Sequence, residues 1–233
     1  MKFLRFKDWG IFQKVMSISI ILNVLMLMSA FFYLIPLVEQ KLMEEKRNAT
    51  KDVLDIAYTL IAAYDHRVTN KELTREQAQK NVLSLIEQLR YRDNDYFWIN
   101  DLEPKMLMHP NFPELDGKNL SNDKDPTGKY LFVEMVNICK EKGEGFVTYM
   151  WPKPGTTQPV PKLSYVKLFK PWGWIVGSGI YFDDVQVEIT RMKWNIIVST
   201  LISVFIVLLF TYFVAHKISE LWKWLSYHPP EQQ

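Results

Sequence analysis

The sequence predicts an α+β fold in which helices cover an antiparallel sheet, flanked by two transmembrane helices. Two observations carry this prediction. First, apolar residues gather in two uncharged blocks, at 15–38 and 194–215, and each block is long enough to cross the ~30 Å hydrocarbon core of a bilayer as a helix. Second, helical patterns between the blocks give way to short aromatic strands and turns, which is typical of a sheet with helices on its faces.

The first block, residues 15–38, contains 24 residues without a charge. A cleaved signal peptide is the alternative interpretation, but this run is longer than the ~7–15 residues of a signal h-region, and a clear small-x-small cleavage site is missing. Asn23 and several serines inside the block indicate a face that packs against another helix rather than lipid. We therefore interpret the block as transmembrane helix 1.

Two amphipathic helices are expected after the first span. Residues 39–64 lack Gly and Pro and carry apolar residues at helical spacing, so this helix should continue directly out of the span. The second helix should follow Thr74, because Gln77 stands three positions later as a capping-box partner. We interpret the apolar stripes of both helices as core and subunit contacts.

Short strands and turns are predicted for the rest of the outer domain. The aromatic segment 95–100 and the alternating segment 105–109 should form a hairpin. A loop rich in Gly, Asn and Asp follows, and then a short helix at about 129–140. The three further strands are expected at 146–151, 162–169 and 174–182.

The second block, WNIIVSTLISVFIVLLFTYFVA, contains 22 uncharged residues and is interpreted as transmembrane helix 2. Basic residues precede the first span and follow the second, namely Lys2, Arg5, Lys7, Lys14, His216, Lys217 and Lys223. The positive-inside rule therefore places both termini in the cytoplasm. The expected order is a cytoplasmic N-terminus at 1–14, an extracytoplasmic domain at 39–193 and a short cytoplasmic tail at 216–233.

Charge, cysteine and histidine usage argue against several function classes. The net charge is +2, and residues 39–193 hold 22 basic and 23 acidic side chains, so nothing favours nucleic acid as a partner. The single Cys139 excludes an intrachain disulfide and a thiolate metal cluster. The four histidines are scattered, and no GxSxG, P-loop or EF-hand spacing occurs. We therefore expect neither an enzyme, nor a metal site, nor a cofactor.

The aromatic residues of the strands favour a small-molecule pocket, because pockets combine apolar walls with a few polar groups. An ammonium beside tyrosines can pair with a carboxylate while hydroxyls bind its second oxygen. Strand alternation places Tyr149 and Trp151 on one face, but it separates Lys162 from Tyr165 unless a bulge intervenes. Lys153, in a turn between two prolines, should be solvated. Ordinary core packing is the alternative interpretation of each aromatic residue.

Several segments resemble the single Cache (sCache-type) domain of bacterial chemoreceptors and sensor kinases: NDYFWINDLEPKMLMHPNFPELDGKNLS, DPTGKYLFVEMV, KGEGFVTYMWPKPG and PKLSYVKLFKPWGWIVGSGIYFDD. The resemblance covers about residues 37–189. It implies a PAS-like antiparallel sheet behind a long N-terminal helix that mediates homodimer contact. It also implies a pocket for small organic acids such as acetate, propionate, pyruvate or lactate. Carried over by motif position, the candidate ligand-binding residues are Tyr96, Trp98, Met108, His109, Tyr149, Trp151, Lys162 and Tyr165.

The resemblance implies a sensor in the bacterial inner (plasma) membrane, with its Cache domain in the periplasm or outside the cell. Lys162 should hold the carboxylate, with Tyr149 and Tyr165 orienting it, and transmembrane helix 2 should pass the signal inward. Family receptors usually continue into a HAMP helix pair and a signalling module, which this sequence lacks. We therefore expect an input-only protein with a separate cytoplasmic signalling partner, or a truncated receptor. The alternatives are an accessory membrane subunit with a degenerate pocket, docking a kinase, chemoreceptor or transporter, and a membrane-bound enzyme.

Overall fold

The computed structural model of the chain describes residues 6, 9–92 and 94–227. The predicted cytoplasmic ends, 1–14 and 216–233, therefore lie partly outside the described residues. Three of the basic residues that predict the membrane orientation, Lys2, Arg5 and Lys7, also lie outside the described residues. The chain forms two compact units. We call residues 42–188 the sheet unit, and residues 1–41 with 189–233 the apolar-helix unit.

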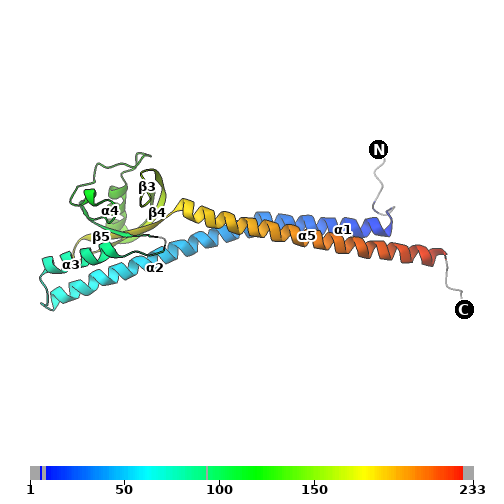
Figure 1. Cartoon of the computed structure of the whole chain (residues 1–233), viewed down its shortest axis with the longest axis horizontal. Helices are drawn as coiled ribbons and strands as arrows, with labels where there is room; N and C mark the ends of the chain where they lie inside the picture. The colour runs from blue at the N-terminus through cyan, green and yellow to red at the C-terminus, as the bar shows by residue number, and fades with distance from the viewer. Residues whose placement is uncertain (1–5, 7–8, 93, 228–233) are drawn as a thin grey trace. The chain divides into compact units, whose positions relative to one another are not determined.

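The sheet unit, whose strands β3, β4 and β5 are labelled in Figure 1, is built on one antiparallel five-stranded sheet with the strand order β2-β1-β5-β4-β3. Its strands are β1 (Phe97–Asp101), β2 (Met106–Met108), β3 (Glu144–Pro152), β4 (Pro159–Phe169) and β5 (Trp174–Tyr181). The predicted hairpin and the three later strands are confirmed. The β3–β4 ladder extends to the pair Pro152–Pro159. Pro donates no hydrogen bond, and it is tolerated here because Pro152 lies on the edge strand β3 and Pro159 is the first residue of β4.

Helices cover both faces of the sheet. α2 (Ile35–Thr69) and α3 (Arg75–Gln88) pack on one face, and α4 (Leu131–Lys142) packs on the other. A short 3-10 helix, η3, spans Pro113–Leu115. The predicted capping box is present, because Gln77 N donates to Thr74 Oγ1 over 3.2 Å and Thr74 N donates to Gln77 Oε1 over 3.0 Å.

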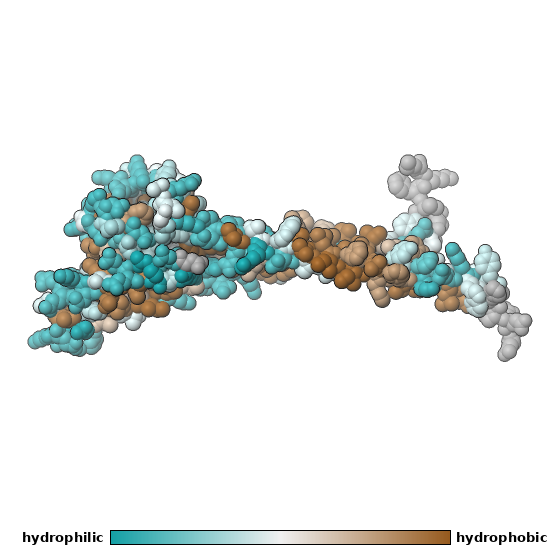
Figure 2. Space-filling view, viewed as in Figure 1, coloured by the Kyte–Doolittle hydropathy of each residue, from teal (hydrophilic) through white to brown (hydrophobic). Residues whose placement is uncertain are grey.

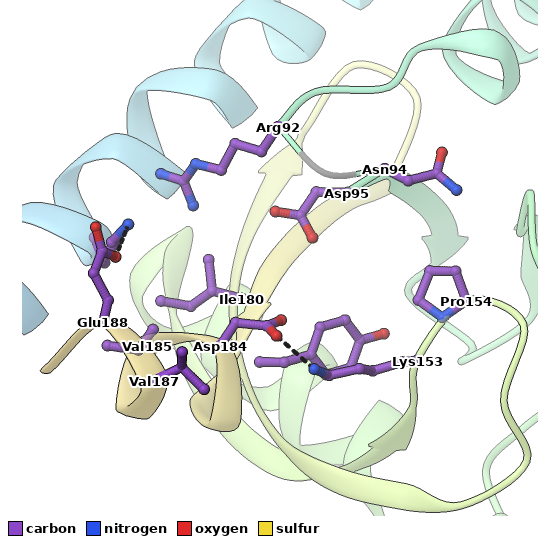
Figure 3. Close-up of a pocket in the computed structure, with 12 residues that line it drawn as sticks. Arg92, Asn94, Asp95, Lys153, Pro154, Ile180, Asp184, Val185, Val187 and Glu188 are labelled. Carbon is purple, nitrogen blue, oxygen red and sulfur yellow. Dashed lines mark hydrogen bonds and ion pairs between the residues drawn. The ribbon is translucent and has the colours of Figure 1, made fainter. Parts of the chain in front are cut away.

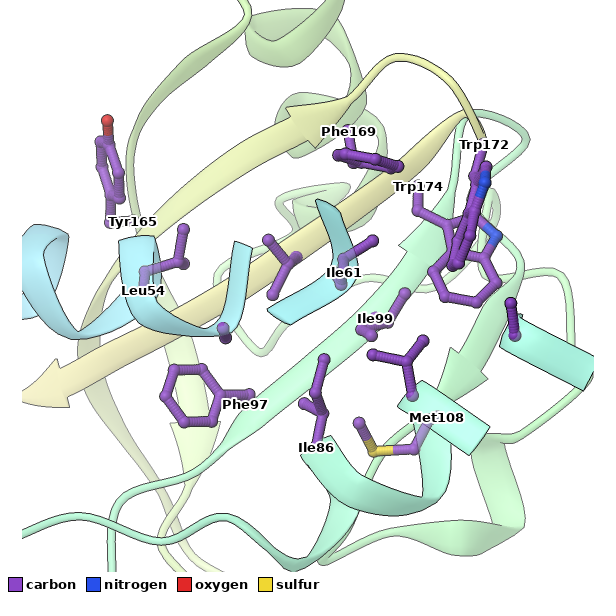
Figure 4. Packing of buried hydrophobic residues seen from close by; sticks show 14 residues of the cluster. Leu54, Ile61, Ile86, Phe97, Ile99, Met108, Tyr165, Phe169, Trp172 and Trp174 are labelled. Atoms are coloured by element: carbon purple, nitrogen blue, oxygen red, sulfur yellow. The ribbon is translucent and has the colours of Figure 1, made fainter. Parts of the chain in front are cut away.

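Strand alternation gives the sheet two separate apolar clusters. In the α2/α3 cluster, Ile61 and Ile86 of the helices meet Phe97 and Ile99 of β1 (Figure 4). The residues that alternate with these two along the chain, Tyr96 and Trp98, point to the other face of the sheet and belong to the α4 cluster. Because burial of one such side chain contributes about 1.5–3 kcal/mol, both clusters fix which side chains face α4.

The apolar-helix unit holds the two predicted spans. α1 (Ile11–Ser29), a π-helical stretch η2 (Ala30–Leu34) and α2 form one continuous helix, as expected, and α5 (Phe182–Tyr227) contains the second apolar block. Both helices are long and apolar enough to cross a membrane, and Figure 2 shows their apolar stretches in brown. Asn23 Nδ2 donates to the Ser19 carbonyl over 2.8 Å, and Ser19 Oγ donates to Thr211 Oγ1 over 3.1 Å. The predicted packing face of the first span is therefore confirmed.

Candidate ligand-binding site

Lys162 is a buried ammonium enclosed by aromatic rings on the α4 face of β4. Its side chain is 1% exposed, and its Nζ donates a hydrogen bond to Tyr96 Oη over 2.9 Å. The same Nζ lies 4.2, 4.8 and 5.2 Å from the ring centroids of Tyr96, Tyr181 and Trp98. Within the described part of the chain, Lys162 forms no ion pair. Aromatic faces therefore stabilise the charge where a buried cation would ordinarily have a carboxylate.

Burial changes the protonation of Lys162. Desolvation lowers the pKa of Lys162 to about 7, and the nearby charge of Asp95 opposes this change. The ammonium form is therefore only partly populated at neutral pH, and a bound anion would favour it.

Three further hydroxyl groups lie near Lys162, two of them on neighbouring strands and one on β4 itself. Tyr149 Oη and Ser164 Oγ share a hydrogen bond of 3.0 Å, and Tyr181 Oη donates to the Pro152 carbonyl over 3.0 Å. Burial raises the pKa of both Tyr96 and Tyr149 well above the ordinary value. These phenols are neutral in the physiological range and can therefore donate hydrogen bonds to an anion.

His109 forms a neutral wall of the same site. Its Nδ1 accepts hydrogen bonds from the backbone N–H groups of Asn111 and Phe112, at 3.3 and 3.1 Å, so its remaining proton lies on Nε2. Burial, followed by the charge of Lys162, lowers the pKa of His109 to about 3. Its ring centroid lies 5.0 Å from that of Tyr96 and 5.7 Å from that of Trp151.

Two indole N–H groups complete a set of hydrogen-bond donors. Trp98 Nε1 is buried without a hydrogen-bond partner among the described residues. Trp151 Nε1 is also buried without a well-formed hydrogen bond, although its proximity to the Tyr96 hydroxyl acts to lower the pKa of that group. A buried donor without a partner costs about 1–3 kcal/mol. The site therefore suits a ligand that brings hydrogen-bond acceptors and negative charge.

The structure brings six of the eight predicted residues together and separates two. The six are Tyr96, Trp98, His109, Tyr149, Trp151 and Lys162. Met108 and Tyr165 lie in the α2/α3 cluster instead, so their expected place beside Lys162 is corrected. Met108 pairs with Ile99 and shares its face, and Tyr165 stands an odd number of residues from Lys162 on a strand without a bulge.

The sequence analysis missed Tyr181 and Ser164. Strand register places Tyr181 on β5 directly opposite Lys162, and Tyr149 lies opposite Lys162 on β3. Lys162 therefore has an aromatic hydroxyl residue on each neighbouring strand. Alternation along β4 was a signal for Ser164, which stands two residues after Lys162.

A cavity of about 500 Å³ lies beside this cluster, at the start of α5 (Figure 3). Lys153 lines the cavity and pairs with Asp183 Oδ2 at 2.7 Å and with Asp184 Oδ1 at 2.5 Å. The expectation that Lys153 is solvated was therefore wrong. Tyr181 also lines the cavity. No group of three or more His, Cys, Asp or Glu side chains in the described residues is placed to hold a metal ion.

Known proteins resemble this chain over most of its length. A family model described as a Cache domain matches residues 28–205. The methyl-accepting chemotaxis protein McpP of Pseudomonas putida is 43% identical over 183 residues, which cover 78% of this chain and 32% of that protein. The sensor histidine kinase MctS of Rhizobium johnstonii is 30% identical over 148 residues, which cover 63% of this chain and 31% of that protein. The chain thus spans about a third of the length of these curated relatives.

Solved structures match the sheet unit. One is described as "Structural basis for carboxylic acid recognition by a Cache chemosensory domain". It is 49% identical, with a TM-score of 0.60, and the match covers 61% of this chain and 97% of that one. Another, described as a periplasmic sensor domain of a chemotaxis protein, is 45% identical with a TM-score of 0.59, covering 60% and 96%.

Proposed function

The chain belongs to the Cache domain family, and we propose that its sheet unit is an extracytoplasmic sensor for a short-chain carboxylate. One observation carries this proposal: Lys162 is a buried ammonium that forms no ion pair within the described residues. A carboxylate would supply the missing negative charge, and charge-assisted hydrogen bonds are the stronger ones.

The surroundings of Lys162 favour a small acid. The tyrosine hydroxyls and the Trp98 indole N–H stand ready as donors, while Trp151, His109 and Tyr96 form close-packed apolar walls. Acids of two or three carbons, such as acetate, propionate, pyruvate and lactate, fit this description. The solved Cache domain described for carboxylic acid recognition supports the same ligand class.

We place the sensor in the inner membrane, with the sheet unit in the periplasm and both termini in the cytoplasm. β5 ends at Tyr181 and α5 begins at Phe182, so no linker separates the strand that faces Lys162 from the helix that contains the second span. A ligand that favours one of two arrangements of the site would therefore bias α5. Homodimer contact through α2 and a cytoplasmic signalling partner complete the proposal.

The proposal is tested by calorimetry with the full chain in lipid nanodiscs. Acetate, propionate, pyruvate and lactate are titrated beside acetamide and propionamide, which keep the shape and lack the charge. We expect at least one acid to bind and neither amide to bind. Absence of binding by every acid, or equal affinity for an acid and its amide, would reject the carboxylate class.

The role of Lys162 is tested in the same assay with Lys162→Met, which keeps a long unbranched side chain and removes the ammonium. Because a hydrogen bond to a charged group contributes about 1.5–3 kcal/mol, we expect a loss of affinity of roughly 10- to 100-fold. Lys170→Met is the matched control, since Lys170 is exposed, and it should bind like the unmodified protein. Unchanged affinity in Lys162→Met would remove Lys162 from the site.

A further inference from the structure

Tyr181 stands between the cavity of Figure 3 and Lys162. It lines that cavity, and its ring centroid is 4.8 Å from Lys162 Nζ and 5.6 Å from Lys153 Nζ. Lys162 itself is 1% exposed, so an acid reaches it only after a side chain moves. Tyr181 contacts both the cavity and the ammonium, and it is therefore the wall whose movement would join the two.

The cavity and the Lys162 ammonium also interact electrostatically. Asp95 lines the cavity and raises the pKa of Lys162 through its charge. A second groove, lined among others by Pro126, Phe132 and Trp151, reaches the site from the α4 side. Lys162 lines neither the groove nor the cavity. Tyr181, whose ring lies beside the Lys162 ammonium, lines the cavity and not the groove.

A closed set of contacts holds Tyr181 in place. Its hydroxyl donates to the carbonyl of Pro152 over 3.0 Å, and the next residue, Lys153, pairs with Asp183 and Asp184. Figure 3 shows the Lys153–Asp184 pair at the edge of the cavity. Both carboxylates lie in the first turn of α5, which follows Tyr181 directly. The loop after β3 and the start of α5 are therefore fastened together around this tyrosine.

We propose that Tyr181 is a gate between the cavity and Lys162, and that Lys153 locks the gate by binding the first turn of α5. The identity of the admitted ligand rests on the proposed function, whereas the gate itself rests on the contacts above. Admission of a ligand requires Lys153 to release Asp183 and Asp184. The event that opens the site thereby frees the first turn of the helix that carries the second apolar block.

The test measures access to position 162 without any acid. In the full chain in lipid nanodiscs, Cys139→Ala removes the native buried thiol, and Lys162→Cys places a thiol behind the gate. The rate of its reaction with methyl methanethiosulfonate reports gate opening. Adding Lys153→Met should raise this rate about five- to tenfold, because two partly exposed ion pairs are lost. Lys170→Met, made in the same background, should leave the rate unchanged.

A second variant separates the gate from a general loosening of the fold. Tyr181→Phe keeps the ring and removes the hydrogen bond to Pro152, so it should also raise the labelling rate while the unfolding temperature changes little. An unchanged rate in Lys153→Met, or an equal rise in Lys170→Met, would overturn the gate. If labelling accelerates but no acid binds the unmodified protein, the gate stands and the carboxylate class falls. If acids bind the unmodified protein but labelling is unchanged in Lys153→Met, the carboxylate class stands and the gate falls.

Discussion

At the scale of single residues, Lys162 combines charge, burial and proximity to hydroxyls in a way that none of its neighbours does. The rings of Tyr96, Trp98 and Tyr181 surround its ammonium, and burial away from water lowers its pKa to about 7. The residue type and the aromatic company were predictable from the sequence. The depth of burial was not, because it depends on Tyr181, whose position opposite Lys162 follows from strand register.

Carboxylate affinity should depend on pH through Lys162. The ligand binds the ammonium form, and the acid itself is ionised above about pH 5. Affinity should therefore be constant from pH 5.5 to 6.5 and should fall above the pKa of about 7, by up to about tenfold per pH unit. His109, whose pKa burial lowers to about 3, contributes nothing in this range. Calorimetry at half-unit steps from pH 5.5 to 9 measures the profile, and an affinity that is flat to pH 9 would contradict it.

At the scale of elements, the period of two along each strand explains most of what the sequence predicted correctly. Alternation sorts Tyr96 and Trp98 from Phe97 and Ile99. Met108 was expected at the site from its motif position, but it pairs with Ile99 beside the register shift of the β1–β2 ladder and lies in the α2/α3 cluster. Alternation within one strand also gives no information about the strand opposite, and Tyr181 was missed for that reason.

The packing of Trp98 requires a glycine on the neighbouring strand β5. A Cβ at Gly177 would lie 2.2 Å from Trp98 Cζ2, so Gly177→Ala displaces the indole that faces Lys162. We expect a loss of about 1–3 kcal/mol in the free energy of unfolding, together with weaker acid binding. Urea unfolding and calorimetry measure the two effects.

The control for this prediction is a double-mutant cycle. Trp98→Leu removes the clashing ring, so Gly177→Ala should cost much less stability in that background than in the unmodified protein. Equal costs in both backgrounds would show that the indole does not occupy the space above Gly177.

At the scale of the whole molecule, the sequence composition predicted the two apolar helices correctly, whereas it predicted the contacts of the site only in part. The thickness of the bilayer sets a length for apolar helices, and the two uncharged blocks meet that length and lie in helices. The ion pairs of Lys153 were not predictable, because Asp183 and Asp184 lie 30 and 31 residues away along the chain. A solvated lysine and an ion-paired lysine have the same local sequence pattern.

The proposed homodimer predicts a contact along α2. Ile56 on this helix is 67% exposed, and we expect it to face its counterpart in the second copy. With Cys139→Ala as background, Ile56→Cys should give disulfide-linked dimers on mild oxidation in membranes. Leu85→Cys is the matched control, because Leu85 lies on α3 and is 43% exposed. Cross-linking of the control alone, or of neither variant, would contradict contact through α2.

Proton uptake on ligand binding tests the pairing of Lys162 with a carboxylate most directly. Calorimetry at pH 7.5, in two buffers of different ionisation heat, counts the protons bound with each ligand. Because the pKa of free Lys162 is about 7 and pairing raises it, the full chain should take up roughly 0.7 proton per acid bound. Lys162→Arg, whose guanidinium is always charged, should take up none. Binding without proton uptake in the unmodified chain, or equal uptake in both proteins, would contradict the account.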